Sequence, residues 1–272
     1  GAGKSTLMKC LFGLYKADSG KIYLDGNLIN IQSTKEALNY GISMIHQELH
    51  SNAHRNVMEN IWLGRFPQRK FGFLNFIDDR KMYQDTLELF KRLNMDIDPK
   101  ATVGRMSISR VQSMEIAKAV SYDSKVIIMD EPTSSLTENE VGQLFDIIRG
   151  LKNQGVAIIY ISHKIEEILQ IANEVTILRD GKRVGVWPSS KLTNDLIISG
   201  MVGRDLTERF PPRENEPAED IILKVENLTS PHFKSFKEIS FNLHYGEILG
   251  IGGLVGAQRT ELIEALFGLR TI

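Results

Sequence analysis

The sequence has 272 residues, of which 33 are basic and 34 acidic, so the formal net charge is −1, and 42% of the residues are hydrophobic. This balance lacks the basic excess that is typical of proteins whose main partner is a nucleic acid, and the length allows one domain or two. The longest strongly apolar stretch, from Val156 to Ile161, is far shorter than the roughly 20 residues that a membrane-spanning helix needs. We therefore expect a globular protein whose attachment to any membrane depends on a partner.

The chain opens on GAGKST, which matches the end of the phosphate-binding loop pattern GxxxxGK followed by Ser or Thr. The first glycine of that pattern would precede Gly1, so we expect the chain to begin inside the loop and to have little activity by itself. Glycines let backbone N–H groups approach phosphate oxygens, Lys4 neutralises phosphate charge, and Ser5 offers a hydroxyl to Mg²⁺. An ordinary glycine turn before a helix is the alternative. The residues expected to bind ATP are Gly1, Ala2, Gly3, Lys4, Ser5 and Thr6.

Gln47 lies in ISMIHQEL, at the end of an apolar run that predicts a strand. Residues from about 51 to 105 then show helical patterns around NVMENIWLG and DRKMYQDTLELFKRLN and no comparable strand, which predicts a helical insert. Gln47 is therefore expected at the boundary between two subdomains. Spacing alone leaves open whether it is a surface glutamine or a residue of the site.

Two adjacent carboxylates follow a second apolar run in VIIMDEPTSS, from Val126 to Ser135. Asp130, at the end of the predicted strand, can hold Mg²⁺ through water, and Glu131 can polarise the water that attacks the γ-phosphate. A solvated acidic turn is the alternative interpretation. The wholly apolar run before the pair and Pro132 after it favour the catalytic one.

A strand-helix-strand unit is predicted around these carboxylates. The apolar runs at residues 125–130 and 156–162 are typical of buried parallel strands, and the segment between them has apolar residues at helical spacing, a capping Thr137 and a terminal Gly155. The pattern indicates a layered α/β fold. His163 directly follows the second strand, at the sheet edge where ligands of such folds bind, and can contact the γ-phosphate.

The start of the chain recurs near its end. GAGKSTLMKCLFGL at residues 1–14 matches GAQRTELIEALFGL at residues 256–269 with an offset of 255 residues, and seven of the fourteen positions are identical. We interpret this as a duplicated domain. Between the copies, residues 205–220 contain six acidic residues, two basic residues and three prolines, a composition that resists regular structure. We therefore expect a first domain at 1–204, a linker at 205–220 and the beginning of a second domain at 221–272.

In this order, GAGKST, Gln47, MSISRVQSMEIAKA, MDEPTSSLT and ISHK resemble the ABC transporter ATPases, over residues 1 to about 203. Within that superfamily, YISHKIEEI, VTILRDGK and MVGRDLTERFP resemble the sugar-import ATPases with two fused domains. The resemblance implies a P-loop NTPase core with a mostly parallel sheet, an antiparallel β subdomain and a helical insert. It also implies ATP and Mg²⁺ as cofactors. The implied catalytic residues are Glu131, His163 and Gln47, and the implied Mg²⁺ ligands are Ser5, Asp130 and Gln47.

The same resemblance implies a protein bound to transmembrane permease subunits at the cytoplasmic face of a bacterial inner membrane. A periplasmic sugar-binding protein would be an indirect partner, and the remainder of the second domain a direct one. The implied cargo is a monosaccharide: galactose or methyl galactoside, or a sugar like ribose or xylose. The alternative is a soluble tandem ATPase that acts on ribosomes or nucleic acid, but such proteins are expected to carry a long, basic or charged helical linker. A nucleotide-binding regulator without turnover is a third interpretation, against which Glu131 argues.

Two segments depart from the pattern of the family. Where its signature usually reads LSGGQ, this chain has Met106 followed by Ser107, Ile108, Ser109 and Arg110, so side chains replace both glycines. In the second copy, Gln258, Arg259 and Thr260 stand where the first copy has Gly3, Lys4 and Ser5. We expect this second loop to bind nucleotide weakly or to turn it over poorly. Its residues are Gly253, Gly256, Gln258, Arg259 and Thr260.

Overall fold

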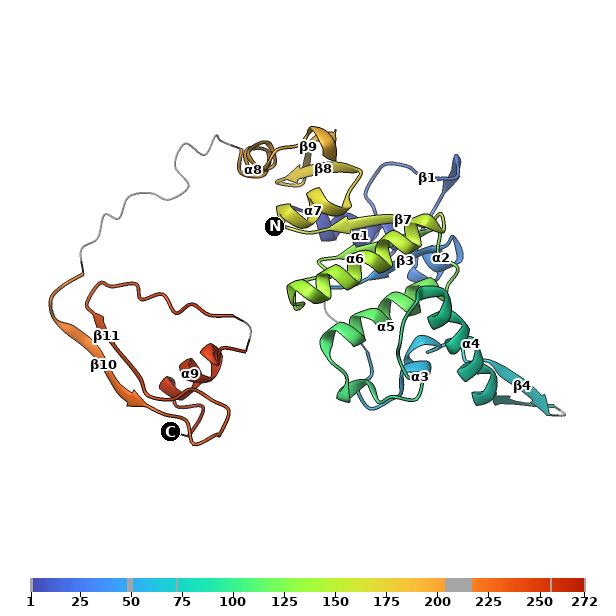
Figure 1. The fold of residues 1–272 in the computed structure, drawn as a ribbon. Helices are drawn as coiled ribbons and strands as arrows, with labels where there is room; N and C mark the ends of the chain where they lie inside the picture. Colours follow the sequence, from blue (N-terminus) through green and yellow to red (C-terminus); the bar gives the residue numbers. More distant parts are fainter. Residues whose placement is uncertain (1, 48–50, 72, 204–216, 255, 272) are drawn as a thin grey trace. The chain divides into compact units, whose positions relative to one another are not determined.

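The structure is a computed structural model that describes residues 2–47, 51–71, 73–203, 217–254 and 256–271. The chain divides into two compact units, Gly1–Leu206 and Thr207–Ile272, which are coloured blue to yellow and orange to red in Figure 1. In the described residues, no helix is both long enough and apolar enough to cross a bilayer.

The first unit is built around a three-stranded parallel sheet with helices on both sides (Figure 1). Its strands are β3 (Ile42–Ile45), β6 (Val126–Asp130) and β7 (Ala157–Ile161), in the order β3-β6-β7. The helices are α1 (Lys4–Leu11), α2 (Thr34–Asn39), α3 (Val57–Ile61), α4 (Asp79–Leu93), α5 (Ile108–Val120), α6 (Glu138–Asn153), α7 (Ile165–Ile171) and α8 (Asn194–Val202). The predicted parallel α/β core is therefore confirmed.

Hydrophobic cores lie on both faces of the sheet, because successive residues of a strand point to opposite faces. Ile127 and Met129 of β6 pack with apolar side chains of α3, α4, α5 and α6. Ile128 points the other way and packs with Phe12 and with residues of α2 and β3. A strand buried on both faces needs apolar residues at every position, which explains why the sequence of β6 shows no alternation.

The helix between β6 and β7 begins and ends where the sequence indicates. Glu140 accepts hydrogen bonds from the backbone N–H and the hydroxyl of Thr137, both at 2.9 Å, and so satisfies a donor at the start of α6. After the helix, Gly155 takes the left-handed conformation, with a φ of +87°, and the chain turns into β7. The predicted strand-helix-strand unit is confirmed.

Short antiparallel strands surround this core. They are β1 (Ile22–Leu24) with β2 (Asn27–Ile29), and β8 (Glu174–Arg179) with β9 (Lys182–Pro188). Two short 3₁₀ helices are η1 (Val103–Arg105) and η2 (Ser189–Lys191). The antiparallel strands that were predicted beside the parallel sheet are therefore present.

The helical insert predicted at residues 51–105 also contains two strands that the sequence pattern did not indicate. Besides α3 and α4, the insert holds an antiparallel hairpin of β4 (Gln68–Phe71) and β5 (Leu74–Ile77), which points away from the rest of the unit in Figure 1. Leu74, Phe76 and Ile77 are all about half exposed. A hairpin that is not buried needs no continuous apolar run, so the criterion that identified the core strands could not detect it.

The second unit contains an antiparallel pair and one helix in the part of it that the structure describes. The elements are β10 (Ile221–Leu228), β11 (Ile239–His244) and α9 (Arg259–Leu266). Phe236, Leu262 and Ala265 form a small buried cluster between them.

The double burial of β6 predicts a large loss of stability on truncation. Ile127→Ala should lower the free energy of unfolding by about 2–5 kcal/mol, because it removes a fully buried side chain and leaves a cavity. The matched control is Leu74→Ala on the exposed hairpin, which should change the free energy of unfolding by less than about 0.5 kcal/mol. Urea unfolding of the full-length protein measures both, and equal effects would contradict the placement of the core.

Candidate functional site

The first part of the site is the start of α1. Gly3 precedes the helix with a φ of +83°, a conformation that glycine adopts without strain. The Ala2 carbonyl accepts a hydrogen bond of 3.3 Å from the N–H of Gly181, in the turn between β8 and β9, which fixes the backbone that leads into the helix. The first N–H groups of a helix lack intrahelical acceptors, so this end of α1 attracts anions. Gly1 lies outside the described residues.

Ser5, in the first turn of α1, contacts the end of β6. Its hydroxyl donates a hydrogen bond of 3.0 Å to Oδ1 of Asp130, which is the last residue of the strand and 4% exposed. A hydroxyl and a carboxylate beside a helix N-terminus are hard oxygen ligands next to an anion site. These two oxygen ligands fit Mg²⁺ bound to a phosphate, as the sequence analysis predicts for Ser5 and Asp130.

Glu131, the residue after β6, is held in an unusual backbone conformation. Its φ is +49°, in the left-handed region that costs a residue with a side chain about 1–3 kcal/mol. Its N–H donates a hydrogen bond of 2.9 Å to the carbonyl of Ile161 at the end of β7. The neighbouring strand therefore stabilises the turn that directs the Glu131 carboxylate away from the sheet.

Both oxygens of the Glu131 carboxylate have a partner from another strand end. Gln47 Nε2, beyond β3, donates to Oε2 at 3.3 Å, and His163 Nδ1, beyond β7, lies 3.1 Å from Oε1. The strand order places Glu131 in the middle, because β6 lies between β3 and β7. The structure thus brings together the three residues that the sequence analysis selected as catalytic. Their chemical roles remain predictions.

A buried polar cluster behind this trio was missed in the sequence. Glu167 in α7 is 7% exposed and accepts hydrogen bonds from Thr133, Tyr160 and Ser162. In sequence, two adjacent glutamates at the start of a helix indicate only a favourable charge near its N-terminus. The one feature of the sequence that could have drawn attention to Glu167 is its position four residues after His163.

The altered signature forms the beginning of α5. The Ser107 hydroxyl accepts a hydrogen bond of 3.4 Å from the N–H of Arg110 and lies 3.0 Å from the Ser109 hydroxyl, while the Ile108 side chain is 53% exposed. A hydrogen bond from Ser109 is the main cause that lowers the pKa of Glu140, in the first turn of α6. Within the described residues, no hydrogen bond or ion pair joins Ser107, Ile108, Ser109 or Arg110 to the Glu131 trio.

The second loop repeats the geometry of the first. Helix α9 begins after Gln258, as α1 begins after Gly3, and Gln258 takes the same left-handed conformation, with a φ of +61°. The N–H of Leu262 donates to the Gln258 carbonyl at 3.1 Å, and that of Leu7 donates to the Gly3 carbonyl at 3.0 Å. Arg259 and Thr260 therefore occupy helix positions equivalent to those of Lys4 and Ser5. Gly253 and Gly256 precede the helix outside any regular element.

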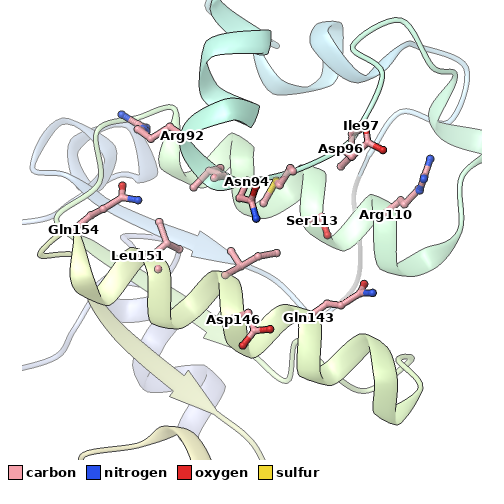
Figure 2. A pocket seen from close by; sticks show the side chains of 14 residues that line it. Arg92, Asn94, Asp96, Ile97, Arg110, Ser113, Gln143, Asp146, Leu151 and Gln154 are labelled. Carbon is pink, nitrogen blue, oxygen red and sulfur yellow. The ribbon is translucent and has the colours of Figure 1, made fainter.

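A cavity of about 490 Å³ lies elsewhere, between the end of α4, the first part of α5 and α6 (Figure 2). Arg110 is the one predicted site residue among those that line it, and Figure 2 shows it at one end of the cavity. Neither Lys4, Asp130 nor Glu131 lines it. The candidate site is therefore the open edge of the sheet and not this cavity.

Comparison with known proteins identifies the family of the chain. The family model described as ABC transporter matches residues 1–134. The chain is 67% identical to the galactose/methyl galactoside import ATP-binding protein MglA of Clostridium tetani over all 272 residues, and 57% identical to the protein of that name in Escherichia coli K12 over 270 residues. The chain belongs to the ABC transporter ATPases. It spans about half the length of these relatives, 54% and 52% respectively.

Solved structures of ABC cassettes share the fold of this ABC ATPase chain. A nucleotide-free ATP-binding cassette from an ABC transporter aligns with a TM-score of 0.60 over 69% of this chain and 76% of its own, at 21% identity. The ADP conformation of another such cassette, MJ1267, aligns with a TM-score of 0.62 over 75% of this chain and 84% of its own, also at 21% identity. Both the predicted fold class and the resemblance to the ABC transporter ATPases are confirmed.

The contact between Ser5 and Asp130 predicts a specific defect in metal binding. In the full-length protein, Asp130→Asn should raise the Mg²⁺ concentration for half-maximal ATP binding about 10- to 100-fold, since a carboxylate that orients a bound cation is lost. Titration of Mg²⁺ with a fluorescent ATP analogue measures this. The control is Asp123→Asn, at an exposed residue whose left-handed backbone also suits asparagine. An unchanged Mg²⁺ requirement in Asp130→Asn would contradict the assignment.

Proposed function

We propose that the chain is part of the ATP-hydrolysing subunit of a bacterial ABC importer for a monosaccharide, with galactose or methyl galactoside as the favoured cargo. The observation that carries this proposal is the Glu131 carboxylate held between Gln47 and His163, directly after the Asp130 that contacts Ser5. The sugar is inferred from the galactose/methyl galactoside import proteins of Clostridium tetani and Escherichia coli K12, which are 67% and 57% identical to this chain. No observation favours a soluble ATPase that acts on ribosomes or nucleic acid.

The start of α1 and the end of β6 hold the nucleotide in this proposal. When bound, ATP with Mg²⁺ would supply an electrophilic γ-phosphate and a cation that neutralises part of its charge. Lys4 neutralises phosphate charge, the Ser5 hydroxyl is a ligand for the cation, and Asp130 orients that hydroxyl through the hydrogen bond between them. In this proposal the backbone N–H groups of Ala2, Gly3, Lys4, Ser5 and Thr6 bind the phosphates.

Glu131 acts as the general base. Its carboxylate orients a water molecule and accepts a proton from it at one oxygen, which makes the water a better nucleophile. Gln47 and His163 fix the carboxylate by their contacts with its two oxygens. The His163 side chain is 59% exposed, and in its protonated form the ring can donate from the nitrogen that does not face Glu131 to a phosphate oxygen. The Gln47 amide oxygen is available for the cation.

The domain plan is a tandem of two cassettes, with the first at 1–204, a linker at 205–220 and the second beginning at 221. The equivalent helices α1 and α9 support this proposal. The proposed direct partners are the rest of the second cassette and the transmembrane permease subunits, which the protein binds at the cytoplasmic face of the inner membrane. A periplasmic sugar-binding protein is the proposed indirect partner and acts through the permease.

The proposed function is tested in the assembled transporter. The full-length protein is reconstituted with its permease in liposomes, and ATP hydrolysis is measured with the sugar-binding protein loaded in turn with galactose, methyl galactoside, ribose or xylose. We expect hydrolysis to rise with galactose or methyl galactoside. Stimulation by ribose or xylose alone would correct the cargo, and stimulation by ribosomes but by no sugar would refute the proposal.

The altered second loop predicts that the two nucleotide sites hydrolyse ATP at unequal rates. Lys4→Ala should abolish hydrolysis and transport, because it removes the positive side chain that neutralises phosphate charge in the site that contains Asp130 and Glu131. Arg259→Ala should leave substantial activity. Loss of one charged contact to the transferring group costs about 2.7–4 kcal/mol, so the turnover of the two sites should differ about 10²- to 10³-fold. Comparable losses in the two full-length variants would mean two working sites.

A further inference from the structure

Glu167 is a buried carboxylate that four donors surround. Its Oε2 atom accepts hydrogen bonds from the hydroxyls of Thr133 at 2.7 Å, Tyr160 at 2.9 Å and Ser162 at 3.1 Å. Its Oε1 atom pairs with Nζ of Lys164 at 3.1 Å. A buried anion is costly unless donors and opposite charge surround it, and here both are present.

The cluster keeps Glu167 ionised. Burial alone would raise the pKa of the carboxyl, but the hydrogen bonds from Thr133, Lys164 and Tyr160 and the charge of Lys164 hold it below its ordinary value. Burial and the nearby Glu167 charge raise the pKa of Tyr160, so its phenol stays protonated and donates. All four contacts are therefore charge-assisted at neutral pH, and such hydrogen bonds are about twice as strong as neutral ones.

The donors of this cluster come from the segments that carry two members of the catalytic trio, Glu131 and His163. Thr133 lies two residues after Glu131, and Lys164 directly follows His163. Lys164 Nζ also donates to the Thr133 carbonyl at 3.2 Å, which joins the two segments a second time. The turn beyond Glu131 is closed by a hydrogen bond of 3.3 Å from the N–H of Ser134 to the Glu131 carbonyl. Glu167 thus holds both segments from the buried side, whereas their functional side chains point to the open edge.

We infer that Glu167 is a positioning residue for hydrolysis, which fixes the Glu131 turn and the His163 segment relative to each other. This inference rests on the proposed function. Glu167 contacts neither Glu131 nor His163 through its side chain, so it acts through Thr133 and Lys164. A displacement of about 1 Å at reacting groups costs up to about 100-fold in rate, which gives a distant carboxylate a measurable influence on turnover.

The test is Glu167→Gln in the full-length protein. The amide keeps the size of the side chain but has one acceptor oxygen, no charge and an NH₂ group that faces other donors. We expect kcat for ATP to fall about 10- to 100-fold, with KM within about twofold of wild type. The matched control is Glu166→Gln, at the adjacent exposed glutamate of α7, which should leave both constants unchanged.

Thr133→Val provides a second variant in case Glu167→Gln unfolds. It removes only the hydroxyl that joins the Glu131 segment to Glu167, and it should reproduce the fall in kcat at unchanged KM. Combining Glu167→Gln with Thr133→Val should cost no more than Glu167→Gln alone, because both changes break the same link between Glu167 and the Glu131 segment.

Hydrogen exchange supplies a readout without nucleotide. We expect peptides that cover residues 131–137 to exchange faster in Glu167→Gln than in wild type or Glu166→Gln. Unchanged exchange with an unchanged kcat in both Glu167→Gln and Thr133→Val would overturn the inference, as would a rise in KM without a fall in kcat. Absence of hydrolysis in wild type would instead refute the proposed function, so the two failures are distinguishable.

Discussion

The parallel pairing of β6 with both β3 and β7 is the constraint on which the rest of the structure depends. Parallel strands end at the same edge of a sheet, so the residues after these three strands must meet there. Met129 lies opposite Ile45 and Tyr160, which sets the register that brings Gln47, Glu131 and His163 to one place. Burial on both faces makes this register difficult to change, because a slip by one residue would exchange the two cores.

The site combines a rigid strand with a strained turn. Asp130 is the last strand residue and is buried, so its contact with Ser5 is fixed by the sheet. Glu131, one residue later, leaves the sheet through a left-handed conformation that its hydrogen bond to Ile161 stabilises. Adjacent carboxylates thus receive different surroundings, one directed to the helix N-terminus and the other to the open edge. The division of roles that we propose, metal binding for Asp130 and proton transfer for Glu131, is based on this difference.

The sequence allowed us to predict those elements that a local pattern of apolar residues identifies. The strands around Asp130 and before His163 show as apolar runs, and their parallel order follows from the helix between them. The role of Gln47 could not be decided, because it depends on the pairing of its strand with one more than 80 residues later. The hairpin of the insert was missed because it is exposed, and Glu167 because nothing in a helical pattern distinguishes a buried glutamate from a solvated one.

The central claim is that Glu131 activates the attacking water, and single-turnover ATP hydrolysis by full-length Glu131→Gln tests it most directly. The amide keeps the size of the side chain but cannot act as the base that accepts the proton. We predict that ATP binding persists and that the hydrolysis rate falls about 10²- to 10⁴-fold, the usual contribution of a general base. A rate equal to that of the wild type would contradict the account.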